Sequence, residues 1–257
     1  MRLLRFGDWS VGVDEPLLSR AGERCTLGPF LGSAESPPPR LVLQAGPVSQ
    51  GQGAPLDPRN PSGPRFLVEG ERVRVEPPQQ ETDTELALRV GMQLATLRQG
   101  GLLLHAAGVA FEGRAVVAIG PSGAGKSTFT RLCAQAAGAA VLSDEVLALY
   151  PGGRVEGSPF CSELELPSTL ARATLEAVLL LHKGGEERME QVSAQEAVTA
   201  MMGQVFRPLP GEASQGEVLR RLASLCQQVE LRRFVFRKHQ AAAGFVRDWL
   251  HGRPGAR

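Results

Sequence analysis

Hydrophobic residues recur at helical spacing in residues 81–101, ETDTELALRVGMQLATLRQGG, and predict the first long helix of the chain. Thr82 and Glu85 have the spacing of a capping box at its start, and Gly100–Gly101 is expected to end it. One face of this helix is formed by four apolar residues three or four positions apart: Leu86, Val90, Leu94 and Leu97.

The pattern changes after this helix, because residues 102–120 are almost continuously apolar. LLLHAAGVAFEGRAVVAIG predicts two buried strands joined at Glu112–Gly113, the second of which runs into a glycine-rich loop. A helix over 126–137 is expected to follow and to stop at Gly138. Residues 139–150, AAVLSDEVLALY, predict a strand, an acidic corner and another strand.

The second half of the chain mixes strands and helices. LEAVLLLHK (175–183) and RMEQV (188–192) predict neighbouring strands around Gly184–Gly185. Ser193 and Glu196 have the spacing of a second capping box. Strands outnumber the helices between them, so the expected fold class is α/β with a mixed sheet. The remaining expected elements are helices over 193–206 and 216–229, a strand over 231–237 and a closing helix through Trp249.

The N-terminal part has a different composition from the rest. Residues 29–78 hold eleven of the nineteen prolines, which excludes long regular elements there. Two apolar runs remain, RLVLQ (40–44) and RFLVEGERVRVE (65–76), and the second predicts a hairpin with Glu69–Gly70 at its turn. We therefore predict a small β-rich region over residues 1–80 and a core over residues 81–257.

Charge and cysteine content exclude several classes of function. The net charge of +1 gives no electrostatic reason to expect nucleic acid or an anionic membrane surface as a partner. The longest nearly apolar stretch, residues 101–111, is too short to span a bilayer. We expect a cytoplasmic protein, and the sequence leaves open whether it forms a homo-oligomer. No CxxC pair occurs among the four cysteines, which argues against a zinc site or a disulfide framework: Cys25, Cys133, Cys161 and Cys226.

One lysine stands out in a chain that has 25 arginines and only three lysines. Lys126 belongs to GPSGAGKST (120–128), which matches G-x-x-x-x-G-K-[ST], the phosphate-binding P-loop. Glycines let backbone N–H groups surround a phosphate, the lysine supplies a compact charge, and Ser127 offers a hydroxyl to Mg²⁺. A glycine turn that merely caps a helix is the alternative. The predicted nucleotide-binding residues are Gly120, Pro121, Ser122, Gly123, Ala124, Gly125, Lys126, Ser127 and Thr128.

A nucleotide phosphate usually requires a metal ion and a carboxylate. Asp144 and Glu145 end the strand that follows the loop and helix, the position typical of a metal-binding acid. An exposed acidic turn is the alternative for either residue. His105 precedes the loop strand and is a candidate to polarise a phosphoryl group or to orient a carboxylate, or it is a structural histidine.

The order of parts over residues 102–146 resembles the kinase domain of HPr kinase/phosphorylase. That family has a His-containing strand, a short hairpin, a phosphate loop with Ser-Gly-x-Gly-Lys-Ser, a helix and a strand ending in paired acids. The related ATP-dependent phosphoenolpyruvate carboxykinase fold has the same order. The resemblance implies a mixed-sheet P-loop kinase core of this type. It also implies that the first acid, or both, binds the metal and acts as base toward a hydroxyl, in one site that contains His105, Lys126, Ser127, Asp144 and Glu145.

The chain departs from the HPr kinase pattern after the acid pair. The pair is Asp-Glu rather than Asp-Asp, residues 1–80 do not resemble that enzyme's N-terminal domain, and GSPFCSELELP (157–167) replaces an Arg-Gly-rich segment. The resemblance therefore does not extend to HPr as the substrate. Either a turn or an acceptor-facing loop fits three consecutive residues of this segment: Cys161, Ser162 and Glu163.

These features predict an ATP-dependent phosphotransferase that uses Mg²⁺ and acts on a hydroxyl of a peptide, a protein or a small molecule. Its expected catalytic residues are Asp144, His105, Lys126 and Glu145, and its expected metal ligands are Ser127 and Asp144. Arg232 and Arg233 are candidates to clamp a phosphate, or they lie on a solvated strand face. The alternative function is a nucleotide-binding regulatory module with little or no phosphotransfer.

Overall fold

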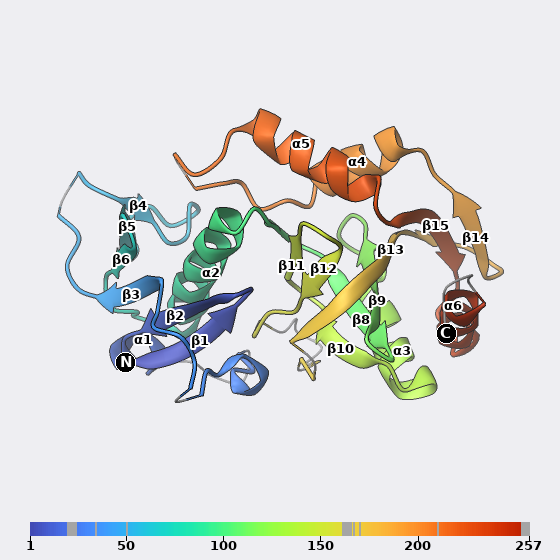
Figure 1. The fold of residues 1–257 in the computed structure, drawn as a ribbon, viewed down its shortest axis with the longest axis horizontal. Coiled ribbons are helices and arrows are strands. Elements are labelled where there is room, and N and C mark those ends of the chain that lie inside the picture. Colours follow the sequence, from blue (N-terminus) through green and yellow to red (C-terminus); the bar gives the residue numbers. More distant parts are fainter. Residues whose placement is uncertain are drawn as a thin grey trace.

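The computed structural model describes residues 1–19, 25–33, 35–49, 51–160, 166, 168–169, 171–209 and 211–252. Within these residues the strands form two mixed sheets, one before residue 80 and one after residue 101 (Figure 1). This arrangement confirms the predicted α/β class with a mixed sheet. The candidate acceptor-facing residues Cys161, Ser162 and Glu163 lie outside the described residues.

The first sheet contains two hairpins joined through parallel pairs. Its order is β1 (Arg2–Phe6), β2 (Trp9–Val13), β3 (Leu41–Ala45), β6 (Arg72–Val75), β5 (Arg65–Glu69) and β4 (Ala54–Pro55). The short helices between β2 and β3 are α1 (Glu15–Leu18) and the 3-10 helix η1 (Gly28–Phe30). The predicted hairpin is confirmed by β5 and β6. Its turn is Gly70–Glu71, one residue later than predicted, because Glu69 already pairs with Arg72.

The predicted long helix is α2 (Glu81–Arg98), and its start differs from the prediction. The capping box at Thr82 and Glu85 is wrong. The carboxylate of Asp83 instead accepts hydrogen bonds from the backbone N–H groups of Gln79 and Gln80, at 2.9 and 3.0 Å. This happens because the helix begins at Glu81, which puts Asp83 at its third position.

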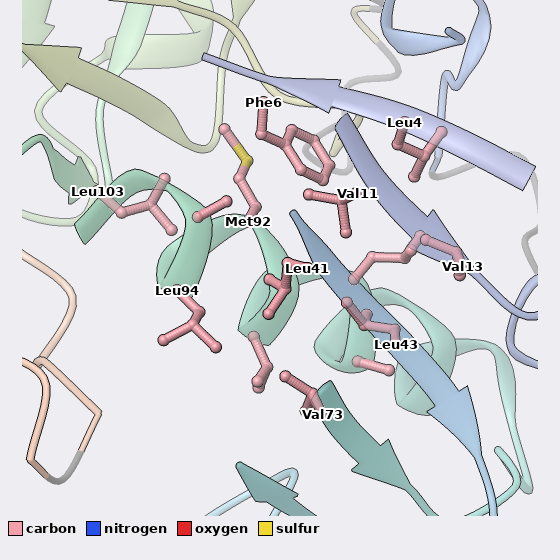
Figure 2. Packing of buried hydrophobic residues seen from close by; sticks show 14 of the residues in the cluster. Leu4, Phe6, Val11, Val13, Leu41, Leu43, Val73, Met92, Leu94 and Leu103 are labelled. Carbon is pink, nitrogen blue, oxygen red and sulfur yellow. The ribbon is translucent and has the colours of Figure 1, made fainter. Parts of the chain in front are cut away.

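Helix α2 is buried on more than one face, because a core surrounds it. Leu41 of β3 belongs to the same buried cluster as Met92 and Leu94 of the helix (Figure 2). Leu103, from the second sheet, joins this cluster as well (Figure 2). The helix is therefore packed against the first sheet and against the start of the second.

The second sheet carries the glycine loop and the acidic corner. Its order is β10 (Ala140–Ser143), β8 (Ala107–Phe111), β9 (Arg114–Ile119), β13 (Arg172–Lys183), β12 (Arg154–Glu156), β11 (Leu147–Tyr150) and β7 (Leu102–Leu104). β12 pairs with the first residues of β13, and β15 (Glu230–Phe236) pairs with its last residues. β14 (Arg188–Gln191) pairs with β15 in turn.

Helices cover both faces of this sheet, as the alternation of side chains along a strand allows. Val117 of β9 packs in one buried cluster with residues of α4 (Ala194–Met202) and α5 (Gln215–Cys226). Its neighbour Val116 packs in another cluster with residues of α3 (Lys126–Ala137) and α6 (Ala241–His251). Among the described residues, no helix has the length and hydrophobicity needed to cross a membrane.

Two expectations about the strands are wrong for the same physical reason. Residues 102–111 form two strands that separate at His105–Ala106, because β7 pairs with β11 whereas β8 pairs with β9 and β10. Strands β13 and β14 are not neighbours, because β15 lies between them. In both cases a distant segment supplies the partner. The predicted end of α3 at Gly138, which has φ +68°, is confirmed.

Candidate functional site

Four strands of the second sheet run in the same direction and end at one edge. β10 and β9 are both antiparallel to β8, and are therefore parallel to each other. β13 is parallel to β9, and β15 is parallel to β13. A pocket of about 640 Å³ is lined by residues that follow the carboxyl ends of these strands. Open α/β sheets bind ligands at this kind of edge.

The glycine loop follows β9 and passes directly into α3. Gly123 and Gly125 have φ values of +78° and +103°, a region that favours glycine. A Cβ atom at Gly125 would lie 3.2 Å from Cζ of Phe236, so the absence of a side chain lets this ring approach the loop closely. The first N–H groups of a helix lack partners within it, and residues 122–128 line the pocket. The predicted loop residues outside the lining are Gly120 and Pro121.

Lys126 begins α3, and its side chain folds back over the loop. The residue is only 7% exposed, and its Nζ donates a hydrogen bond to the carbonyl oxygen of Gly120 at 3.0 Å. Burial lowers the pKa of its ammonium group, and the nearby Glu145 partly opposes this effect. Because an ammonium group has three N–H donors, Lys126 keeps donors for an anion in the pocket.

The acidic corner between β10 and β11 is held by the buried hydroxyl of Ser143. Its Oγ accepts hydrogen bonds from the backbone N–H groups of Glu145 and Val146, both at 3.1 Å. The same Oγ lies 3.2 Å from the carbonyl oxygen of Phe160, to which it can donate. This turn places Asp144, which is 1% exposed, and Glu145 in the pocket wall.

His105 joins the acids from the break between β7 and β8. Its backbone N–H donates to the carbonyl oxygen of Gln204 at 2.8 Å, and its Nδ1 lies 3.5 Å from Oε1 of Glu145. Burial, helped by the charge of Lys126, lowers the pKa of His105. Burial also raises the pKa of Glu145. In both groups, burial disfavours the charged form.

The structure brings together all the predicted catalytic residues and both predicted metal ligands. It does not bring the two candidate arginines of β15 into the pocket lining. Arg232 forms an ion pair with Glu230 at 2.9 Å, and Arg233 pairs with Glu190 at 3.0 Å. Sequence reasoning missed the other side of the pocket, which is lined by Lys183, Gly184, Phe236, Arg237 and Lys238.

Comparison with known proteins gives only a distant likeness. No family model matches the chain, and no curated protein matches it. One similar solved structure is the Hpr(Ser) kinase/phosphatase from Coxiella burnetii, with 12% sequence identity and a TM-score of 0.29. The match covers 58% of this chain and 93% of that protein's chain.

Proposed function

We propose that this chain is an ATP-dependent phosphotransferase that moves the γ-phosphoryl group to a hydroxyl of a peptide, a protein or a small molecule. The observation that carries the proposal is the pocket itself. A glycine loop, the buried Lys126, the buried Asp144 and the His105–Glu145 pair line one cavity of about 640 Å³. The order of these parts resembles the kinase core of HPr kinase/phosphorylase and of ATP-dependent phosphoenolpyruvate carboxykinase.

The loop side of the pocket is suited to the β- and γ-phosphates. The N-terminal N–H groups of α3 and its helix dipole favour an anion, and Lys126 adds a positive charge. Among the described residues, no side chain caps this end of the helix, so its N–H groups are available to a phosphate. An anion would also offset the cost of burying the ammonium group.

The acid side of the pocket is suited to a magnesium ion. Ser127 and Asp144 both line the pocket and offer the oxygen atoms that Mg²⁺ prefers. No cluster of three His, Cys, Asp or Glu side chains that could hold a metal occurs in the described part of the chain. Two protein ligands nevertheless suit Mg²⁺, which keeps waters and takes substrate phosphates as its other ligands. When bound, the ion would neutralise charge on the transferred phosphoryl group.

The transfer itself needs a base near the acceptor. Asp144, which lines the pocket, would accept the hydroxyl proton while the acceptor oxygen bonds to the γ-phosphorus and the bond to the leaving ADP breaks. Lys126 would stabilise the negative charge that collects on the ADP oxygen. His105 and Glu145, whose Nδ1 and Oε1 atoms lie 3.5 Å apart, would orient the acid.

The test requires no known acceptor, because slow transfer to water releases ADP from the same machinery. The intact protein should bind Mg·ATP in calorimetry, and Lys126→Ala should weaken this binding strongly. Asp144→Asn should keep most of the affinity but slow ADP release by about 10²–10⁴-fold, the usual contribution of a general base. Glu145→Gln should have a smaller effect.

Three outcomes would count against the proposal. Equal ATP affinity in the wild type and in Lys126→Ala would remove the phosphate-loop assignment. An ADP-release rate that Asp144→Asn leaves unchanged would remove its catalytic role. ATP binding without measurable transfer, to water or to any tested hydroxyl, would favour the nucleotide-binding regulatory module.

A further inference from the structure

One side of the pocket is basic, and its residues have no role in the proposed phosphoryl transfer. Lys183 ends β13, and Arg237 and Lys238 follow β15, at the same edge as the glycine loop. All three lysines of the chain, Lys126 included, therefore line one cavity, although 25 arginines supply nearly every other positive charge. Lysine presents a compact and mobile ammonium group, which binds a phosphate as a point charge, whereas arginine presents a planar guanidinium.

The charges along this edge are ordered by strand. The acids follow β10, the phosphate loop follows β9, and the basic residues follow β13 and β15. Neighbouring strands are about 4.8 Å apart, so the acids and the end of β15 lie on opposite sides of the loop, each about 10 Å away. The pocket therefore has an acidic side and a basic side, with the phosphate loop between them.

In-line transfer gives each side a different task. The attacking and leaving oxygens lie on opposite sides of the γ-phosphorus. With the γ-phosphate turned toward Asp144, the rest of the nucleotide must extend away from the acids, toward β13 and β15. We propose that Lys183 and Lys238 form a second anion subsite, which binds the α-phosphate end of the nucleotide. This inference rests on the proposed function.

The backbone under this subsite is fixed. The N–H of Gly184 donates to the carbonyl oxygen of Phe236 at 2.9 Å, which ties the end of β13 to the end of β15. Arg237 contributes less charge, because its Nε lies 3.6 Å from Oε1 of Glu187. Within the described parts of the chain, Lys183 and Lys238 have no ion-pair partner, and both are exposed. Their charges are therefore available to a ligand.

Calorimetry with two probes isolates the subsite. In the presence of Mg²⁺, ATP reaches both anion sites, whereas inorganic pyrophosphate has only enough phosphates for the loop. The double variant Lys183→Gln/Lys238→Gln should weaken ATP binding by about tenfold or more, since one charge-assisted hydrogen bond is worth about that factor. Its affinity for pyrophosphate should stay within about twofold, whereas Lys126→Ala should weaken the binding of both probes.

The control variant removes two charges outside the pocket. Arg188→Gln/Arg247→Gln loses two exposed arginines of β14 and α6 and should leave ATP affinity unchanged. An unchanged ATP affinity in the double lysine variant would overturn the subsite, as would an equal loss for ATP and pyrophosphate. Melting temperatures are measured for every variant, and the single lysine variants replace the double one if it is unfolded. If the wild type fails to bind ATP, the proposed function fails instead.

Discussion

Ser143 shows how one buried hydroxyl sets the geometry of the candidate site. Its Oγ accepts hydrogen bonds from the backbone N–H groups of Glu145 and Val146 in the acidic corner. The residue is fully buried at the end of β10. Without this acceptor, the two N–H groups would be left without their partner in a water-poor region, and the direction of Asp144 would no longer be fixed.

Ser143→Ala should therefore lower both stability and activity. The expected loss is about 1–3 kcal/mol in the free energy of unfolding, the cost of unsatisfied buried groups, measured by urea denaturation. The rate of ADP release should fall by a larger factor than the affinity for ATP. Ser19→Ala is the matched control, because its Oγ is exposed and donates to the carbonyl oxygen of Pro16. Equal stability in the two variants would contradict the role given to Ser143.

At this scale, the sequence predicts one side of the pocket and misses the other. The loop residues are contiguous, and Asp144 follows the next strand, so a local motif is enough to group them. Their roles stay predictions. Lys183 and Lys238 come together only through the parallel pairing of β13 and β15, which no local pattern encodes. The one signal that could have found them is the scarcity of lysine.

Two helical elements contain a glycine away from their ends, and the surroundings of each decide its effect. In α2, a Cβ atom at Gly91 would lie 2.7 Å from Cδ1 of Leu43, so the missing side chain lets the helix approach β3. In α6, a Cβ atom at Gly244 would meet nothing within 4 Å. The same substitution should therefore have opposite effects in the two helices.

Gly244→Ala should raise the free energy of unfolding by about 0.5–1 kcal/mol, because alanine loses less backbone entropy in a helix. Gly91→Ala should lower it by about 1–3 kcal/mol through overpacking against Leu43. Urea denaturation of both variants gives the signs directly. Destabilisation by Gly244→Ala, or no change with Gly91→Ala, would show that the packing of these helices differs from that described.

Elements with local partners are predicted well, and elements with distant partners are not. The β5–β6 hairpin and α3 follow from turn residues and apolar spacing alone. The break at His105 and the insertion of β15 depend on partners far away in the chain. The break matters for the site, because it turns His105 out of the sheet ladder and toward Glu145.

At the scale of the whole molecule, the two sheets are joined by polar contacts at the β1–β2 turn. The backbone N–H of Gly7 donates to Oε2 of Glu156 at 2.6 Å, and Arg172 donates to Oε1 of Glu156 at 2.8 Å. Arg172 also donates to the carbonyl oxygen of Gly7, and Arg154 pairs with Asp8, both at 2.8 Å. One hydrophobic cluster spans both sheets as well.

These contacts predict that the chain unfolds in a single transition, even though composition predicts a boundary near residue 80. That boundary stays a prediction, and Glu156→Ala tests it. The variant leaves the Gly7 N–H without its acceptor and removes one hydrogen-bond partner of Arg172. The chain should therefore still unfold in one transition in urea, with a free energy of unfolding that is lower by about 1–3 kcal/mol. Asp8→Ala is the control, with an expected loss of about 0–1 kcal/mol, because this carboxylate is 64% exposed. Two separate transitions, with only one of them sensitive to Glu156→Ala, would instead mean that residues 1–80 and 81–257 fold as independent domains.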